Sequence, residues 1–200
     1  TITTEVGMQD GWHAHEVATA VDDGGNVHAT WIGDDLKPWY ANSQDQGATW
    51  STPMMVAAPG VVETGFPTIF AGAAGRVVLG YIGETEDYDE GNGTGGWSGY
   101  MAIITDAFVE RPLITSVAVN SPGDPLDVTP DCGDVRCGGF GDFIDVEIDD
   151  EGRPWIALAH NAAGYEEAII GTLMEGPALY GELAYLEPLP AGGNSSLLLG

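Results

Sequence analysis

The sequence predicts an all-β protein, and three observations support this. The 200-residue chain contains 30 glycines and 12 prolines, residue types that interrupt helices and form turns. Its apolar residues show almost no helical periodicity. Instead, an apolar run, a turn rich in Gly and Asp, and an alternating apolar run recur along the chain. Hydrophobic residues make up 44% of the chain, which indicates a folded domain with a core rather than a disordered segment.

The strand–turn–strand unit occurs three times. The three copies are VATAVDDGGNVHATWIG (17–33), PTIFAGAAGRVVLGYIG (67–83) and IDVEIDDEGRPWIALAH (144–160). Each copy has a turn glycine, Gly25, Gly75 or Gly152. Glycine adopts positive φ without steric cost, so each copy is expected to form a tight β-hairpin.

Further strands follow each hairpin. The candidates are PWYANS (38–43) and TWSTPMMV (49–56), GYMAIITDA (99–107) and PLITSVAV (112–119), and EAIIGTLM (167–174). Units of about 40–50 residues with four strands each are typical of β-propeller blades. We therefore expect a propeller or partial propeller of about three to four four-stranded blades within residues 1–181, and a Pro/Gly/Leu-rich tail at 182–200. The blades should lie near 17–56, 67–119 and 144–174.

The turn after residue 42 reads SQDQGATW and contains the pattern S-x-D-x-G-x-T-W. Its defining residues are Ser43, Asp45, Gly47, Thr49 and Trp50. An Asp side chain in such a turn accepts backbone N–H bonds, glycine supplies the unusual φ, and the Trp ring packs between strands. The pattern resembles the BNR or Asp-box repeat of sialidase-like β-propellers, where it is structural and lies away from the central site.

The resemblance extends over most of residues 13–180. HAHEVATAVDDGGNVHATWIGDD (13–35) and GFGDFIDVEIDDEGRPWIALAHN (139–161) are similar to secreted, uncharacterised sialidase-like proteins. Only an Asp remains where TDAFVERP (105–112) could carry a second Asp box. The resemblance implies a propeller fold and secretion, but not an activity.

True sialidases bind the substrate carboxylate with three arginines and attack through a Tyr paired with a Glu. The arginines here are Arg76, Arg111, Arg136 and Arg153. Arg76 and Arg153 follow turn glycines, so we expect them at solvent-facing turns, and an arginine triad is not expected. The sequence therefore predicts no catalytic residues. A sialidase-like glycoside hydrolase and a calcium-dependent glycan-binding domain remain alternatives.

The chain has 31 acidic and 5 basic residues, a formal net charge of −26. This charge argues against nucleic-acid partners and anionic membranes, because both are bound through Lys and Arg. No apolar run is long enough to cross a bilayer, so membrane insertion is not expected. The acidity favours adaptation to a salty medium, with divalent-cation binding in loops as the alternative.

The cysteine pair and two sequons point to an extracellular or cell-surface location. Cys132 and Cys137 fit a small disulfide loop in an oxidising compartment, although two free buried thiols remain an alternative. Asn92 and Asn194 begin sequons and are candidate glycosylation sites.

Several side chains are candidate metal or sugar ligands. The acidic candidates are Asp131, Asp134, Asp142 and Asp145. Their oxygen atoms suit Ca²⁺ or sugar hydroxyls, although for Asp142 and Asp145 a role in capping the start of a strand is favoured. His13 and His15 lie two apart, so on a strand they would share a face and could bind a metal or simply pack. No cofactor is required by this interpretation, with Ca²⁺ as the optional ion.

Isolated His and Trp residues favour structural roles. His28 and His160 stand alone and are expected to be structural. Trp12, Trp39 and Trp97 are either packing residues or sugar-stacking platforms.

Three blades do not close a ring, and unpaired strand edges promote association. The start TITTEVG (1–7) is expected to be a strand without its own hairpin. We therefore expect a non-catalytic module for binding or self-assembly, whose partners are further copies or the rest of a longer chain, or a glycan.

Overall fold

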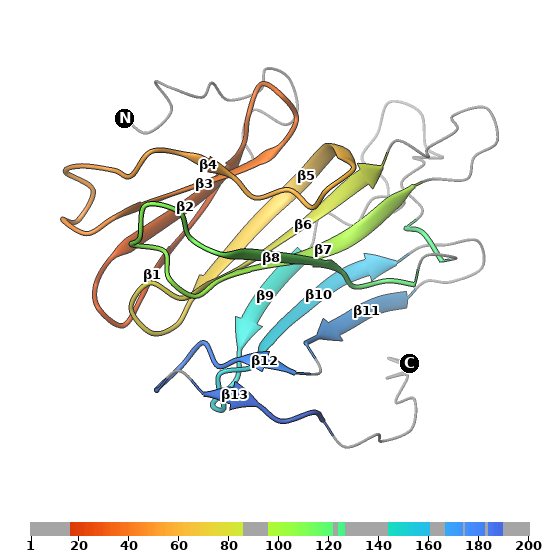
Figure 1. Ribbon diagram of the computed structural model, residues 1–200. Helices are drawn as coiled ribbons and strands as arrows, with labels where there is room; N and C mark the ends of the chain where they lie inside the picture. The colour runs from red at the N-terminus through yellow and green to blue at the C-terminus, as the bar shows by residue number, and fades with distance from the viewer. Residues whose placement is uncertain are drawn as a thin grey trace.

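The computed structural model describes residues 17–85, 96–121, 124–126, 144–160, 167–173, 175–182 and 184–189. Every regular element within these ranges is a β-strand, so the predicted all-β class is confirmed (Figure 1). The described residues contain no helix of the length and apolarity that a membrane span needs.

Two antiparallel sheets of four strands follow each other along the chain, each with its strands in sequence order. The first contains β1 (Val17–Val21), β2 (Val27–Ile32), β3 (Pro38–Ser43) and β4 (Met54–Met55). The second contains β5 (Val61–Ala71), β6 (Val77–Thr85), β7 (Trp97–Ile104) and β8 (Ile114–Ala118). Both therefore have the strand order that the repeated units predict.

The third sheet has three strands in the described part of the chain, with β10 (Pro154–His160) between β9 (Ile144–Ile148) and β11 (Glu167–Thr172). A short hairpin of β12 (Gly176–Pro177) and β13 (Tyr185–Leu186) follows. The hairpin includes residues that the sequence assigns to a tail. Leu179, in the turn between its strands, is fully buried and belongs to the second core cluster.

The turn glycines have the conformation that the sequence indicates. Gly25, Gly75 and Gly152 have φ values of 80°, 75° and 87°. In the first and third hairpins the glycine N–H donates to the carbonyl oxygen three residues earlier, Asp22 in one and Asp149 in the other. A glycine with positive φ therefore closes the equivalent turn in each of the three sheets.

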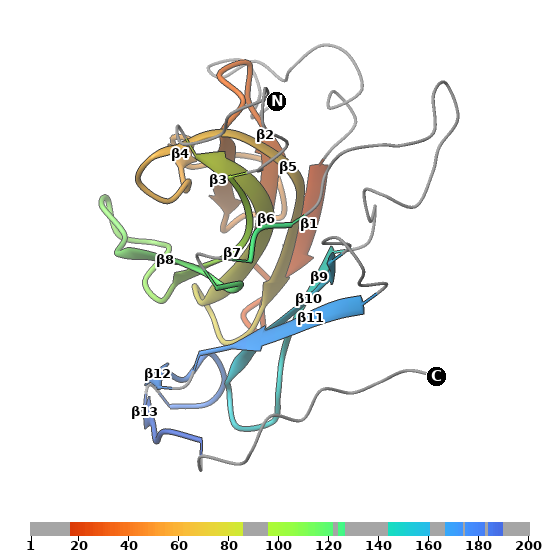
Figure 2. The ribbon, with the colours of Figure 1, turned by 90° about the vertical axis from the view of Figure 1, so that its right-hand side faces the viewer.

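The three sheets stack face to face, and their first strands lie side by side. β1 packs against β5, and β5 packs against β9 (Figure 2). One apolar cluster, which includes Tyr40, Leu79 and Tyr81, fills the space between the first and second sheets. A second cluster, which includes Val78, Met101 and Ile156, lies between the second and third sheets. We call the side of a sheet that faces the preceding sheet its near face, and the opposite side its far face.

The hairpin turns of neighbouring sheets are joined by backbone hydrogen bonds. Asp23 N–H donates to Gly72 O at 2.9 Å, which joins the first and second sheets. Ala73 N–H donates to Leu179 O, and Leu179 N–H donates to Gly152 O, so Leu179 bridges the second and third sheets. A Cβ on Gly72 would lie 2.2 Å from Leu179 O, so this approach requires glycine.

Arg153 is buried, and the expectation of a solvent-facing turn is wrong for this residue. Its guanidinium donates to Leu173 O at 2.8 Å and Glu187 O at 2.9 Å. The turn is covered because the chain after β11 folds back over it, a long-range event that the local sequence does not encode. Arg76 is half-buried and donates to Ala178 O at 3.1 Å and Gly181 O at 3.0 Å.

Candidate functional site

The Asp45 turn lies between β3 and β4 and is satisfied entirely by its own residues. Asp45 Oδ1 accepts the Thr49 N–H and the Ser43 hydroxyl, each at 2.8 Å. Thr49 Oγ1 donates to Asp45 Oδ2 at 2.6 Å, and Gly47 N–H donates to Ser43 Oγ at 2.8 Å. Gly47 has a φ of 89°, and Trp50 is half-buried. Ser43, Asp45, Gly47 and Thr49 therefore form one closed local network.

The charge on Asp45 is held by the same contacts. The Thr49 hydroxyl, the Thr49 N–H and the Ser43 hydroxyl stabilise the carboxylate, and they lower its pKa from 3.8 to about 2. Asp45 itself is exposed. The turn leaves little acceptor capacity for a ligand, so its geometry fits a structural role.

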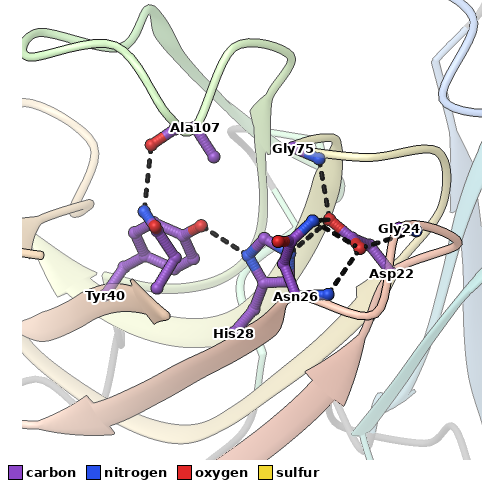
Figure 3. A network of polar contacts seen from close by, with 8 residues as sticks. Asp22, Gly24, Asn26, His28, Tyr40, Gly75 and Ala107 are labelled. Carbon is purple, nitrogen blue, oxygen red and sulfur yellow. Dashed lines mark hydrogen bonds and ion pairs between the residues drawn. The ribbon is translucent and has the colours of Figure 1, made fainter. Parts of the chain in front are cut away.

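A second aspartate, Asp22, lies at the β1–β2 turn and is the centre of a buried polar network (Figure 3). Asp22 Oδ1 accepts the N–H groups of Gly24 and Asn26, both at 2.9 Å. Asp22 Oδ2 lies 3.0 Å from His28 Nε2 and accepts Gly75 N–H at 2.8 Å. Asp22 therefore joins its own turn to a turn of the second sheet.

The network continues from His28 to Tyr40. His28 Nδ1 lies 2.7 Å from the Tyr40 hydroxyl. Since a carboxylate only accepts, His28 Nε2 carries the proton toward Asp22, and neutral Nδ1 accepts from Tyr40. The His28 ring stacks on Tyr40 and on Phe108, with centroids 6.0 and 6.1 Å away.

Burial and hydrogen bonding set the ionisation of these groups. Burial lowers the pKa of His28, although the nearby Asp22 carboxylate opposes this shift. Burial also opposes the charge on Asp22, but the donors from Gly75, His28 and Asn26 dominate and lower its pKa to about 2. Burial raises the pKa of Tyr40. The network at neutral pH is thus an Asp22 carboxylate, a neutral imidazole and a neutral phenol.

Asp22, His28 and Tyr40 are arranged like a catalytic triad, but a substrate cannot reach them. A carboxylate that orients a histidine next to a hydroxyl is the arrangement of a nucleophile triad. His28 and Tyr40 are both fully buried, so neither reaches a substrate in this conformation. The arrangement supports a structural function, the attachment of the first sheet to the second. Asn42 extends this attachment, because its Nδ2 donates to Ala107 O at 2.9 Å and Ala107 N–H donates to Gly75 O.

Most of the predicted metal-ligand, disulfide and glycosylation residues lie outside the described residues. They are His13, His15, Asn92, Asp131, Cys132, Asp134, Cys137, Asp142 and Asn194. Asp145 lies on β9, exposed, and its Oδ1 accepts the N–H of Val146 at 2.9 Å. In the described part of the chain, no three His, Cys, Asp or Glu side chains gather as a metal site would require.

Three of the described cations join different parts of the fold through backbone carbonyls. Lys37 Nζ donates to Val61 O, which ties the β2–β3 turn to β5. Arg76 and Arg153 hold carbonyls near the β12–β13 hairpin, as described above, while Arg111 is exposed in the loop before β8. These positions do not form an arginine cluster that could hold a carboxylate.

The described tryptophans among the candidate sugar-stacking residues pack in the core or bond to a neighbouring side chain. Trp97 is buried in the second core cluster, and half-buried Trp39 donates its Nε1–H to Asp35 at 2.9 Å. Trp12 and the strand expected at residues 1–7 lie outside the described residues. A hollow of about 250 Å³ lies between β7–β8 and β11 and is lined by both polar and apolar groups, which include Met101, Val117 and Thr172. It is smaller than the pockets that usually hold drug-sized ligands.

Sequence reasoning missed the role of Asp22. The signal that could have drawn attention to it is the run DDGGN (22–26), an Asp followed by Gly and Asn as in an Asx turn. Nothing in the local sequence indicates Gly75 as the partner of Asp22.

No family model matches the chain, and no curated protein matches it in sequence.

Proposed function

We propose that this chain is a non-catalytic extracellular or cell-surface module of the sialidase-like β-propeller type that acts by binding or self-assembly. The observation that carries the proposal is the repeated stack. Antiparallel sheets with strands in chain order succeed one another, and the first strand of each lies next to the first strand of the next. This is the way in which propeller blades are arranged.

Two further features support a non-catalytic role. The Asp22 carboxylate is saturated by protein donors, Asp45 is bound by donors of its own turn, and Asp22, His28 and Tyr40 are buried. Lys37, Arg76 and Arg153 all donate to backbone carbonyls that stabilise the stack.

The net charge of −26 suits a protein whose assembly depends on salt. At about 0.1 M salt the Debye length is about 10 Å, and at about 1 M it is about 3 Å, so like-charged copies repel each other far less in concentrated salt. Self-assembly should therefore increase with ionic strength, which is opposite to the behaviour of an association driven by ion pairs.

A mass measurement of native particles with electron micrographs of the same samples tests the proposal. We expect oligomers, rings or filaments at high salt and smaller particles at low salt. A monomer at every salt concentration that also cleaves a sialoside substrate would replace this proposal with the hydrolase alternative. A monomer whose thermal stability falls when a calcium chelator is added would favour the glycan-binding alternative.

A further inference from the structure

The two ends of the sheet stack expose apolar side chains at positions that are buried inside the stack. Val21 lies four residues before the turn glycine of the first sheet, on its near face, and is 61% exposed. The equivalent residues, counted from their own turn glycines, are Ala71 on β5 and Ile148 on β9. They are only 7% and 6% exposed, because the preceding sheet covers each of them.

The same comparison holds at the other end of the stack. Ile170 pairs with Ala157 on the far face of the third sheet and is 59% exposed. Its equivalents are Tyr40, which pairs with Thr30, and Met101, which pairs with Gly80. Both are fully buried against the following sheet. At Ile170, the third sheet therefore leaves exposed a far-face position that is covered in both preceding sheets.

The first strand of each sheet makes most of the contacts between neighbouring sheets. The second sheet meets the first largely through β5, and the third meets the second through β9. In the first sheet, β1 is the equivalent strand. Its alternate residues Val17, Thr19 and Val21 are exposed on the near face, while Ala18 and Ala20 pack toward the second sheet. Ala29, Trp31 and Ala41, in the middle of the near face, are buried, so the open surface is β1 itself together with Met55 at the outer strand.

We infer that the far face of the third sheet in one copy docks against the exposed near side of β1 in a second copy, through a first-strand contact like those that β5 and β9 make within the chain. This inference rests on the proposed function and names its partner and its surfaces. The contact continues an interface that the fold already makes twice, between the first and second sheets and between the second and third. Since the two surfaces differ, the contact is head to tail, and it yields rings if the rotation closes and filaments if it does not.

Two carboxylates modulate this contact. Asp145 and Glu147 are exposed on β9 and share the far face with Ile170. Burial of unpaired carboxylates is unfavourable, so they weaken the docking and make it dependent on screening. Replacing both with their amides should strengthen association.

Sedimentation velocity of the full chain at about 2 M NaCl, where screening is strong, tests the inference. Val21→Asp and Ile170→Asp should each weaken association about tenfold or more, because each puts a charge into one of the two surfaces. Val109→Asp is the matched control, since Val109 is an exposed valine in the β7–β8 turn outside both surfaces.

The double variant Asp145→Asn with Glu147→Gln should associate more strongly than the wild type. The double variant Glu151→Gln with Glu182→Gln removes the same charge outside both surfaces, and its association should increase less. Circular dichroism verifies that each variant is folded.

A mixture of the Val21→Asp and Ile170→Asp proteins gives the sharpest result. Each variant keeps one intact surface, so the mixture should form a dimer and nothing larger, while each variant alone stays monomeric. If the wild-type protein assembles but both variants assemble equally well, the docking surfaces are wrong and the proposed function stands. If the mixture stays monomeric while the wild type assembles, the head-to-tail contact is wrong. A wild-type protein that is monomeric at every salt concentration overturns this inference and the self-assembly function together.

Discussion

The two aspartate-centred turns of the first sheet use the same chemistry for different purposes. Asp45 binds Ser43 and Thr49, so all its partners lie within a few residues, and it is exposed. Asp22 binds Gly24 and Asn26 in the same local way, but it also binds His28 and the distant Gly75, and it is buried. A carboxylate that completes a turn costs little to remove when water can replace it. The same group becomes part of the tertiary structure when its donors are buried.

Asp22→Ala should have the largest effect. It leaves the N–H groups of Gly75 and His28 buried without their acceptor, and we expect the free energy of unfolding to fall by about 3 kcal/mol. Urea denaturation measures this loss. Asp22→Asn keeps the shape and one acceptor oxygen, so it should cost less than Asp22→Ala. An Asp22→Ala protein as stable as the wild type would show that the two sheets do not depend on this network.

The buried network should also make the fold sensitive to acid. The pKa of His28 is lowered in the folded state, so below about pH 6.5 the unfolded chain binds a proton that the folded chain does not. The free energy of unfolding therefore decreases as the pH is lowered below about 6.5. Asp22 adds a second loss between pH 3.8 and about 2, as its carboxylate becomes protonated. We expect the Asp22 contribution to be about 2 kcal/mol, because one unit of pKa shift corresponds to about 1.4 kcal/mol.

Thermal unfolding at a series of pH values measures this dependence. His28→Gln removes the first titration, so its stability should change less between pH 6.5 and pH 5 than that of the wild type. An identical pH profile in the two proteins would contradict the proposed role of His28.

Tyr40→Phe should have a smaller effect. It removes only the hydroxyl that donates to His28 Nδ1 at 2.7 Å and leaves the ring packing in place. The expected loss is about 1 kcal/mol, measured by the same denaturation experiment. A loss equal to that of Asp22→Ala would mean that the network is no stronger at Asp22 than at its far end.

Asp45→Ala should have the smallest effect on global stability, less than half the shift in the unfolding midpoint of Asp22→Ala. Its consequence should be local. The amide hydrogens of Gly47 and Thr49 should exchange faster with solvent, while those of β2 and β6 keep their protection. Hydrogen exchange followed by mass spectrometry or NMR measures the difference. Faster exchange throughout the second sheet would show that the Asp45 turn, too, supports the tertiary contacts.

The same contrast separates what the sequence could and could not predict. The contacts of the Asp-box turn could be predicted from the sequence, because Asp45 and all its partners lie between residues 43 and 49. The hairpin glycines were also predictable, since a tight turn requires positive φ at one position. The partnership of Asp22 and Gly75 spans 53 residues and has no local signature. Arg153 was misplaced for a similar reason, because its carbonyl partners Leu173 and Glu187 are brought to it by the later chain.

By itself, the sequence determined the all-β class, the order of the strands in the sheets and the internal chemistry of the turns. Each of these depends on alternation and φ preferences over a few residues, and short-range sterics and hydrogen bonds act before the chain is folded. Only the tertiary structure decided which turn is buried, which cations hold the stack, and which apolar faces remain open at its ends. These features arise when whole sheets pack against one another, and burial then changes the free energy of the same side chains.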